Sequence, residues 1–287
     1  MRNTGNAVVA CIDGSSYSSA VCDYAAWMAD RIGAPLKLLH NIEHPPSAVM
    51  ADLSGSIGLG SREELLTELT EIEQQRNRLM LEKGKLMLEG ARDRIRAAGG
   101  PDPEIWQRHG NLNESLVEME EKLRVLVLGL RGERHEGDET GVGAHLETVV
   151  RALHKPILVV NKEFAPPRRV MLAYNGSDAC QKALSMIAAT DLFKNIPCHL
   201  VHVGKRSAQA ETMLKDATNI LTEAGQETHS AILDGKLEEA LTQYQADNGI
   251  DMTIMGAFSH NRVRDFLLGS FTARMLADTR QPLLLLR

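Results

Sequence analysis

Aromatic side chains are scarce in this 287-residue sequence, and it has neither an excess of positive charge nor a long apolar run. Phe, Trp and Tyr together make up 4% of the residues, which disfavours a stacking surface for single-stranded nucleic acid. The formal net charge of −6 disfavours general binding to nucleic acid or to an anionic membrane. No apolar run approaches the length that spans a bilayer. We therefore expect neither nucleic acid nor a membrane among the partners.

Cysteine is also scarce, and its four positions are scattered: Cys11, Cys22, Cys180 and Cys198. They form no C-x-x-C pair, so we expect buried thiols in a reducing compartment. The first residues show no signal-peptide pattern and lead into a short apolar segment. These features together predict a cytoplasmic protein. The ten histidines show no zinc-type spacing with the cysteines, and we expect no metal site.

What the sequence does have is a regular alternation of short apolar runs and helical patterns. In the first half, we expect strands at residues 7–12, 35–42, 104–109, 125–128 and 157–160. Helical spacing covers residues 18–32, 61–98, 112–122 and a segment that ends near 154. A serine of the turn at residues 13–16 is a candidate cap for the first helix, and Gly84 is a candidate break in the long charged one. Strands that alternate with helices predict a parallel sheet with right-handed crossovers.

The same pattern then repeats. Residues 170–177 match residues 8–15 at an offset of 162, and residues 198–202 match residues 36–40 at the same offset. Gly256 matches Gly129 further along, at an offset of 127, because the second copy lacks a loop insertion and much of the long helix. A duplication follows. We expect two domains, residues 1–163 and 168–287, each a Rossmann-like five-stranded parallel sheet flanked by helices.

A glycine-containing loop follows the expected strand at residues 252–255. Gly256 is followed after two residues by Ser259, and after nine more by the pair Gly269-Ser270, which opens a helical pattern. Free backbone N–H groups at such a helix start can hold a phosphate, and glycines let the backbone approach it. The intervening loop carries cations that favour an anion, namely His260, Arg262 and Arg264.

This spacing resembles G-x2-G-x9-G-[ST], the nucleotide loop of the universal stress protein family, with Ser259 in place of the second glycine. The resemblance covers both halves nearly end to end. The chain is therefore similar to a tandem, two-domain member of that family. It implies the adenine-nucleotide alpha hydrolase-like fold and a bound ATP, with ADP or AMP as alternatives. In family members that bind ATP, an aspartate after the first strand contacts the adenosine portion. Asp13 matches that position, and Asn175 replaces it in the second copy.

The two halves keep different parts of the pattern. The N-terminal copy has Gly129 and Gly132, but its next pair, Gly143-Ala144, comes one residue later and lacks the hydroxyl. Acidic residues in between, Glu133, Glu136, Asp138 and Glu139, would repel phosphate. We therefore expect the nucleotide in the C-terminal half and a degenerate first copy.

The resemblance implies a stress-response sensor or regulator. The alternative hypothesis is a structural or interaction protein in which both nucleotide sites have lost the ability to bind. Slow ATP hydrolysis is the most chemistry we expect, because no motif places a general base, and neither a G-x-S-x-G elbow nor a Walker A loop is present.

Single-domain family members commonly pair through their last strands, and this chain has two copies of that strand, at residues 157–160 and 283–286. We expect these two strands to meet within one chain, so that its two halves form a pseudo-dimer. A homodimer of two chains is also compatible with the sequence.

Overall fold

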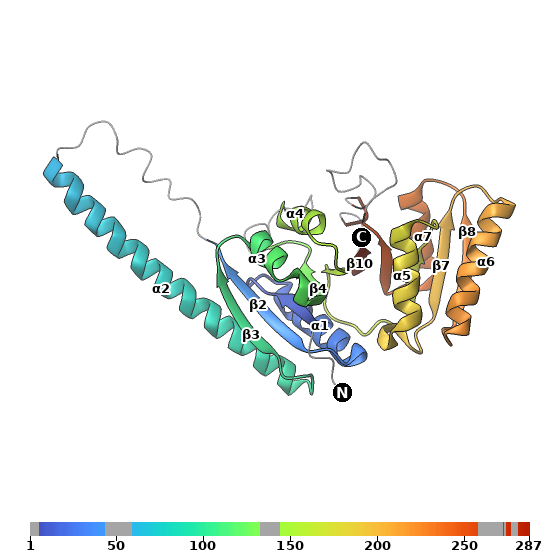
Figure 1. Cartoon of the computed structure of the whole chain (residues 1–287), viewed down its shortest axis with the longest axis horizontal. Coiled ribbons are helices and arrows are strands. Elements are labelled where there is room, and N and C mark those ends of the chain that lie inside the picture. The colour runs from blue at the N-terminus through green and yellow to red at the C-terminus, as the bar shows by residue number, and fades with distance from the viewer. Residues whose placement is uncertain (1–5, 44–58, 133–143, 258–271, 273, 277–280) are drawn as a thin grey trace.

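The computed structural model describes residues 6–43, 59–132, 144–257, 272, 274–276 and 281–287 (Figure 1). The strands of the first half are β1 (Ala7–Cys11), β2 (Leu36–Ile42), β3 (Glu104–His109), β4 (Leu123–Gly129) and β5 (Ile157–Val160). Its helices are α1 (Ser18–Ile32), α2 (Leu59–Ala97), α3 (Leu112–Glu118) and α4 (Ala144–Ala152), with a 3-10 turn at Glu120–Lys122.

The second half repeats this order in a shorter form. Its strands are β6 (Val170–Ala173), β7 (Cys198–Val203), β8 (Thr228–Leu233), β9 (Met252–Gly256) and β10 (Leu283–Leu286). Its helices are α5 (Asp178–Ala189), α6 (Ala208–Glu223) and α7 (Leu237–Asn248), with a 3-10 turn at Asp191–Phe193. The prediction of tandem Rossmann-like α/β units with flanking helices is therefore confirmed.

All ten strands form one sheet in the order β3-β2-β1-β4-β5-β10-β9-β6-β7-β8. Within each half the neighbouring strands run parallel, and the two halves have the same strand order read outward from their last strands. β10 pairs with β5 antiparallel, and Leu284 lies opposite Leu158. The two last strands thus meet within the chain, and the sheet runs without a break from one half into the other.

Side chains alternate between the two faces of this sheet. Along β1, Val8 and Ala10 belong to one buried cluster, whereas Ala7 and Val9 belong to another on the opposite face. Helices cover both faces of the sheet, so side chains on either face of a central strand are buried. The sequences of such strands are therefore continuous apolar runs.

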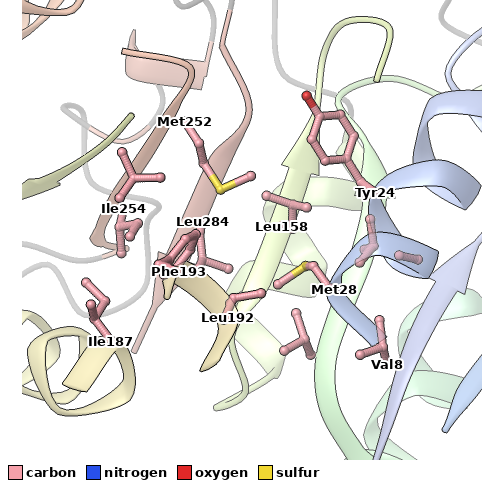
Figure 2. Close-up of a cluster of buried hydrophobic side chains, with 14 of the residues drawn as sticks. Val8, Tyr24, Met28, Leu158, Ile187, Leu192, Phe193, Met252, Ile254 and Leu284 are labelled. Atoms are coloured by element: carbon pink, nitrogen blue, oxygen red, sulfur yellow. The ribbon is translucent and has the colours of Figure 1, made fainter. Parts of the chain in front are cut away.

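The first of these clusters crosses the boundary between the halves. Met28 and Leu158 of the first half lie near Leu192, Phe193 and Leu284 of the second (Figure 2). The Arg31 guanidinium of α1 also donates from Nε to the Leu192 carbonyl at 3.0 Å. The two halves therefore share a hydrophobic core as well as a sheet.

Three local expectations from sequence differ from the structure. α2 continues through Gly84, where a Cβ atom would come within 2.6 Å of His40 Cδ2, so the glycine allows close packing on β2 instead of a break. No side chain caps α1; instead, the Gly14 N–H donates to Ser18 Oγ at 3.1 Å. The helix expected over 112–122 ends at Glu118 and continues as the 3-10 turn.

Among the residues that the structure describes, no helix is both long enough and apolar enough to cross a membrane.

Candidate functional site

A cleft opens at the carboxyl ends of the parallel strands in the N-terminal half. Its wall includes residues that follow β1 and β4, the last residues of β2, and two residues of α2: Ile12, Asp13, His40, Asn41, Met80, Lys83, Arg131 and Gly132. β2 lies on one side of β1 and β4 on the other, so the strand order reverses there. Ligands of open α/β sheets bind in the crevice at such a switch point. The topology therefore selects this cleft as the candidate site.

Asp13 lies two residues after the end of β1 and is held in a tight turn. Its Oδ1 accepts from the Ser15 N–H at 3.0 Å and from the Ser18 hydroxyl at 3.3 Å. Gly14 has a φ of 87°, a left-handed conformation that glycine adopts without strain. The turn fixes the direction of the carboxylate and orients it toward the loop after β4.

The other carboxylate oxygen lies against that loop. A Cβ atom built on Gly132 would come within 2.8 Å of Asp13 Oδ2, closer than side-chain atoms normally approach. Gly132 therefore has a reason to be glycine that does not depend on a phosphate. The structure brings Asp13 and Gly132, which the sequence analysis named as separate parts of the motif, close together.

Asn175 occupies the same place in the second half. Its Oδ1 accepts from the Ser177 N–H at 3.0 Å, and Gly176 has a φ of 76°. An amide oxygen accepts as a carboxylate oxygen does, so the change from aspartate to asparagine preserves the turn and removes only the charge.

The glycines that end β4 and β9 have a packing role. A Cβ atom on Gly129 would lie 2.9 Å from Tyr17 Cβ, and one on Gly256 would lie 3.1 Å from Ala179 Cβ. Tyr17 and Ala179 are equivalent positions in the two copies, each at the start of the first helix of its half. Both glycines thus let the first helix approach the sheet closely.

His40 is one of several wall residues that were not among the predicted site residues. His40 lines the cleft, and its Nδ1 lies 2.9 Å from the Ile12 carbonyl oxygen. His202 makes the equivalent contact with the Tyr174 carbonyl at 3.0 Å. Because a carbonyl only accepts, Nδ1–H donates in both cases. The recurrence of His40 and His202 at the 162-residue offset is the sequence signal that could have identified them.

Charges of both signs surround the apolar centre of the cleft. Asp13 and Glu43 are acidic, whereas Lys83 and Arg131 are basic. Lys83 comes from α2. This wall suits a ligand that combines an apolar ring with hydroxyl and anionic groups.

The Cys11 thiol also lines the cleft. Burial, with a further contribution from the charge of Asp13, raises its pKa to about 12. The thiol is therefore protonated at neutral pH and is not a nucleophile. Among the described residues, no group of three or more His, Cys, Asp or Glu side chains is arranged to hold a metal ion.

The remaining predicted site residues lie outside the described residues. They are Gly143 in the first half and Ser259, His260, Arg262, Arg264, Gly269 and Ser270 in the second. The expectation that the C-terminal loop holds the triphosphate therefore stays a prediction.

Comparisons with known proteins identify relatives over the whole chain. The pattern of the Universal stress protein family matches residues 6–161 and 167–287. Universal stress protein Slr1230 from Synechocystis sp. is 37% identical over 284 residues, which cover 98% of this chain and 99% of that protein. The crystal structure of a universal stress protein from Archaeoglobus fulgidus DSM 4304 is similar with a TM-score of 0.70 and 18% identity, over 98% of this chain and 96% of that one. A protein of unknown function from Pseudomonas aeruginosa PAO1 is similar with a TM-score of 0.61 and 13% identity, over 98% and 92% of the two chains. At these identities the two structural matches concern the fold alone.

Proposed function

The chain belongs to the universal stress protein family as a member with two tandem domains, and from this premise we propose that it binds an adenine nucleotide and acts as a stress-response sensor or regulator. The proposed ligand is ATP, with ADP and AMP as alternatives. The support comes from the cleft at the switch point of the N-terminal half, where polar groups surround an apolar centre.

The observation that carries the proposal is the approach of Gly132 to the Asp13 carboxylate. The turn holds Asp13 Oδ1, so Oδ2 is presented at the point where the loop after β4 meets the loop after β1. A carboxylate there can accept from a ribose hydroxyl, and the backbone of the glycine loop can approach a phosphate closely. The nearby cations Lys83 and Arg131 favour an anionic ligand over a neutral nucleoside.

The location within the chain is a second part of the proposal. The described residues support the N-terminal cleft, whereas the sequence predicts the C-terminal loop, because that loop keeps the family spacing and carries cations. The acidic residues at positions 133–139 should weaken binding of a triphosphate more than of a monophosphate in the first half. We therefore expect the preference for ATP over AMP to be smaller in the N-terminal cleft than in the C-terminal loop.

Titration calorimetry of the whole chain with ATP, ADP and AMP tests both parts. Gly132→Val should abolish binding in the N-terminal cleft, because its Cβ would displace the Asp13 carboxylate. Gly90→Val is the matched control, since a Cβ atom there has no neighbouring atom within 4 Å. Gly269→Val makes the equivalent test of the C-terminal loop.

The outcomes separate the alternatives. Loss of binding in Gly132→Val alone supports the N-terminal cleft, and loss in Gly269→Val alone supports the C-terminal loop. If the unmodified chain, freed of co-purified nucleotide by denaturation and refolding, binds none of the three, the proposal is wrong and an interaction protein with decayed sites is the better description.

We also propose that the protein acts in the cytoplasm. The four cysteines are free, and burial raises the pKa of Cys22 and Cys198 to about 12, as it does for Cys11. Buried, protonated thiols are consistent with a reducing compartment.

A further inference from the structure

The long helix α2 carries a row of exposed apolar side chains. Ile72, Leu79 and Leu86 are 55%, 60% and 64% exposed, and they recur at intervals of seven residues. Leu69, which is half-buried, lies three residues before Ile72, just outside this row. The outer part of α2 extends away from the sheet (Figure 1). A solvent-exposed helix is only marginally stable on its own, and bare leucines on it favour a partner.

The row lies on the face of α2 that points away from the domain. Leu88 and Ile95, which are both 1% exposed, pack in the core of the first half. They follow Leu79 and Leu86 by nine residues, which is about two and a half helical turns and places them on the opposite side of the helix. The domain therefore uses one face of α2, and the row of Ile72, Leu79 and Leu86 forms a second apolar face.

The spacing of this second face is that of a coiled-coil seam. Apolar residues seven apart occupy one of the two core positions of a heptad, a or d. Residues three to four positions away occupy the other, and the two lines together form the seam. Here that other line contains Leu69 and the exposed cation Arg76, and it ends at Lys83, which also borders the cleft. Two parallel copies would place Arg76 against Arg76, which is unfavourable. An antiparallel pair would place each cation opposite an apolar residue instead.

Charge along the helix favours the same direction. Residues 67–75 contain Glu68, Glu71 and Glu73 and no Lys or Arg. Residues 76–85 contain four cations, Arg76, Arg78, Lys83 and Lys85, and one acid, Glu82. Antiparallel pairing brings the acidic segment of each helix beside the basic segment of the other, whereas parallel pairing brings like charges together.

We propose that the α2 helices of two copies of this chain pair antiparallel along the row Ile72, Leu79 and Leu86 together with Leu69, which makes the protein a homodimer. In the register that the row suggests, Leu69 faces Leu86 of the second copy, and Leu79 faces Arg76 of the second copy. The overlap of residues 69–86 is about 27 Å long. This interface is separate from the β5–β10 pairing, which lies within one chain.

Sedimentation equilibrium of the whole chain over a concentration series tests the proposal. The expected species has twice the 31.5 kDa mass of one chain. Leu79→Lys should weaken the dimer about 100-fold or more, since each of the two lost leucines contributes about tenfold and each new lysine faces Arg76. Leu79→Glu should weaken it less, because the new carboxylate can pair with that arginine. Gln74→Lys, on an exposed part of the helix away from the row, is the matched control and should change nothing.

Circular dichroism of each variant checks that α2 stays helical. A chain that sediments as a monomer at every concentration overturns the proposal, and so does a dimer that responds equally to Leu79→Lys and Gln74→Lys. A dimer that Leu79→Lys and Leu79→Glu weaken equally overturns the antiparallel register, since in a parallel pair each new charge would face its own copy.

Discussion

The shared core of the two halves predicts an energetic coupling between two leucines of different halves. Leu158 of β5 and Leu284 of β10 lie opposite each other in the antiparallel pair, and neither is exposed to solvent. Each change to alanine should lower the free energy of unfolding by about 2–5 kcal/mol, the usual range for a fully buried leucine. Because the two side chains share one contact, the double variant should lose less than the sum, with a coupling of about 0.5–3 kcal/mol.

Urea unfolding of the two single variants and the double variant measures this coupling. The matched control pairs Leu284→Ala with Leu221→Ala, an equally buried leucine of α6 in the same half as Leu284. α6 packs on β7 and β8, which β9 and β6 separate from β10, so these two changes should add within about 0.5 kcal/mol. Strict additivity for Leu158 and Leu284, with each change affecting only its own half, would refute the reasoning that the two halves form one packed unit.

Three further predictions follow from the same structure. The two halves, residues 1–163 and 168–287, should associate when they are expressed separately, and halves that each remain monomeric when mixed at high concentration would contradict the pseudo-dimer. The pKa of His199 lies below its ordinary value because of burial, with smaller contributions from His229 and Arg169. The folded chain then binds fewer protons than the unfolded one, so this contribution to stability should be present above about pH 6.5 and be lost as the pH falls through that value toward the folded pKa. Urea midpoints measured across this range should fall more steeply for the unmodified chain than for His199→Gln, and parallel curves would show that His199 is not the cause. Nucleotide turnover should lie far below the roughly 1–10³ per second of ordinary enzymes, and sustained turnover in that range that is lost in the binding-site variants would contradict a regulatory role.

Much of the fold could be predicted because its local signals are redundant. β1 and β6 each appear as an apolar run followed by an Asp-Gly-Ser or Asn-Gly-Ser turn, and the repeat at a fixed offset supports both assignments at once. The boundaries of α1 agree with the periodicity to the residue. Gly84 shows the limit of such reasoning, since glycine in a helix suggests a break, whereas here the nearby ring of His40 leaves no room for a side chain and the helix continues.

The site was predicted less completely than the fold. Asp13 and Gly132 were both chosen as separate parts of a motif, but their mutual contact depends on how the loops after β1 and β4 meet. His40 and Lys83 were not chosen at all, because neither belongs to the motif, and α2 brings Lys83 to the cleft from a distant part of the sequence.

The sequence by itself determined the duplication, the strand and helix order, the turn chemistry at Asp13 and Asn175, and the family, because each of these depends on residues close together or on a repeat within the chain. The family resemblance led us to expect that β5 and β10 meet, and the structure shows the antiparallel pair that joins the two sheets. Only the tertiary structure decided that one apolar cluster spans both halves and that the outer face of α2 is exposed. The physical reason is that burial is a property of a whole surface. A leucine at a helical spacing is equally suited to a core or to a partner, and which of the two it contacts depends on where the rest of the chain lies.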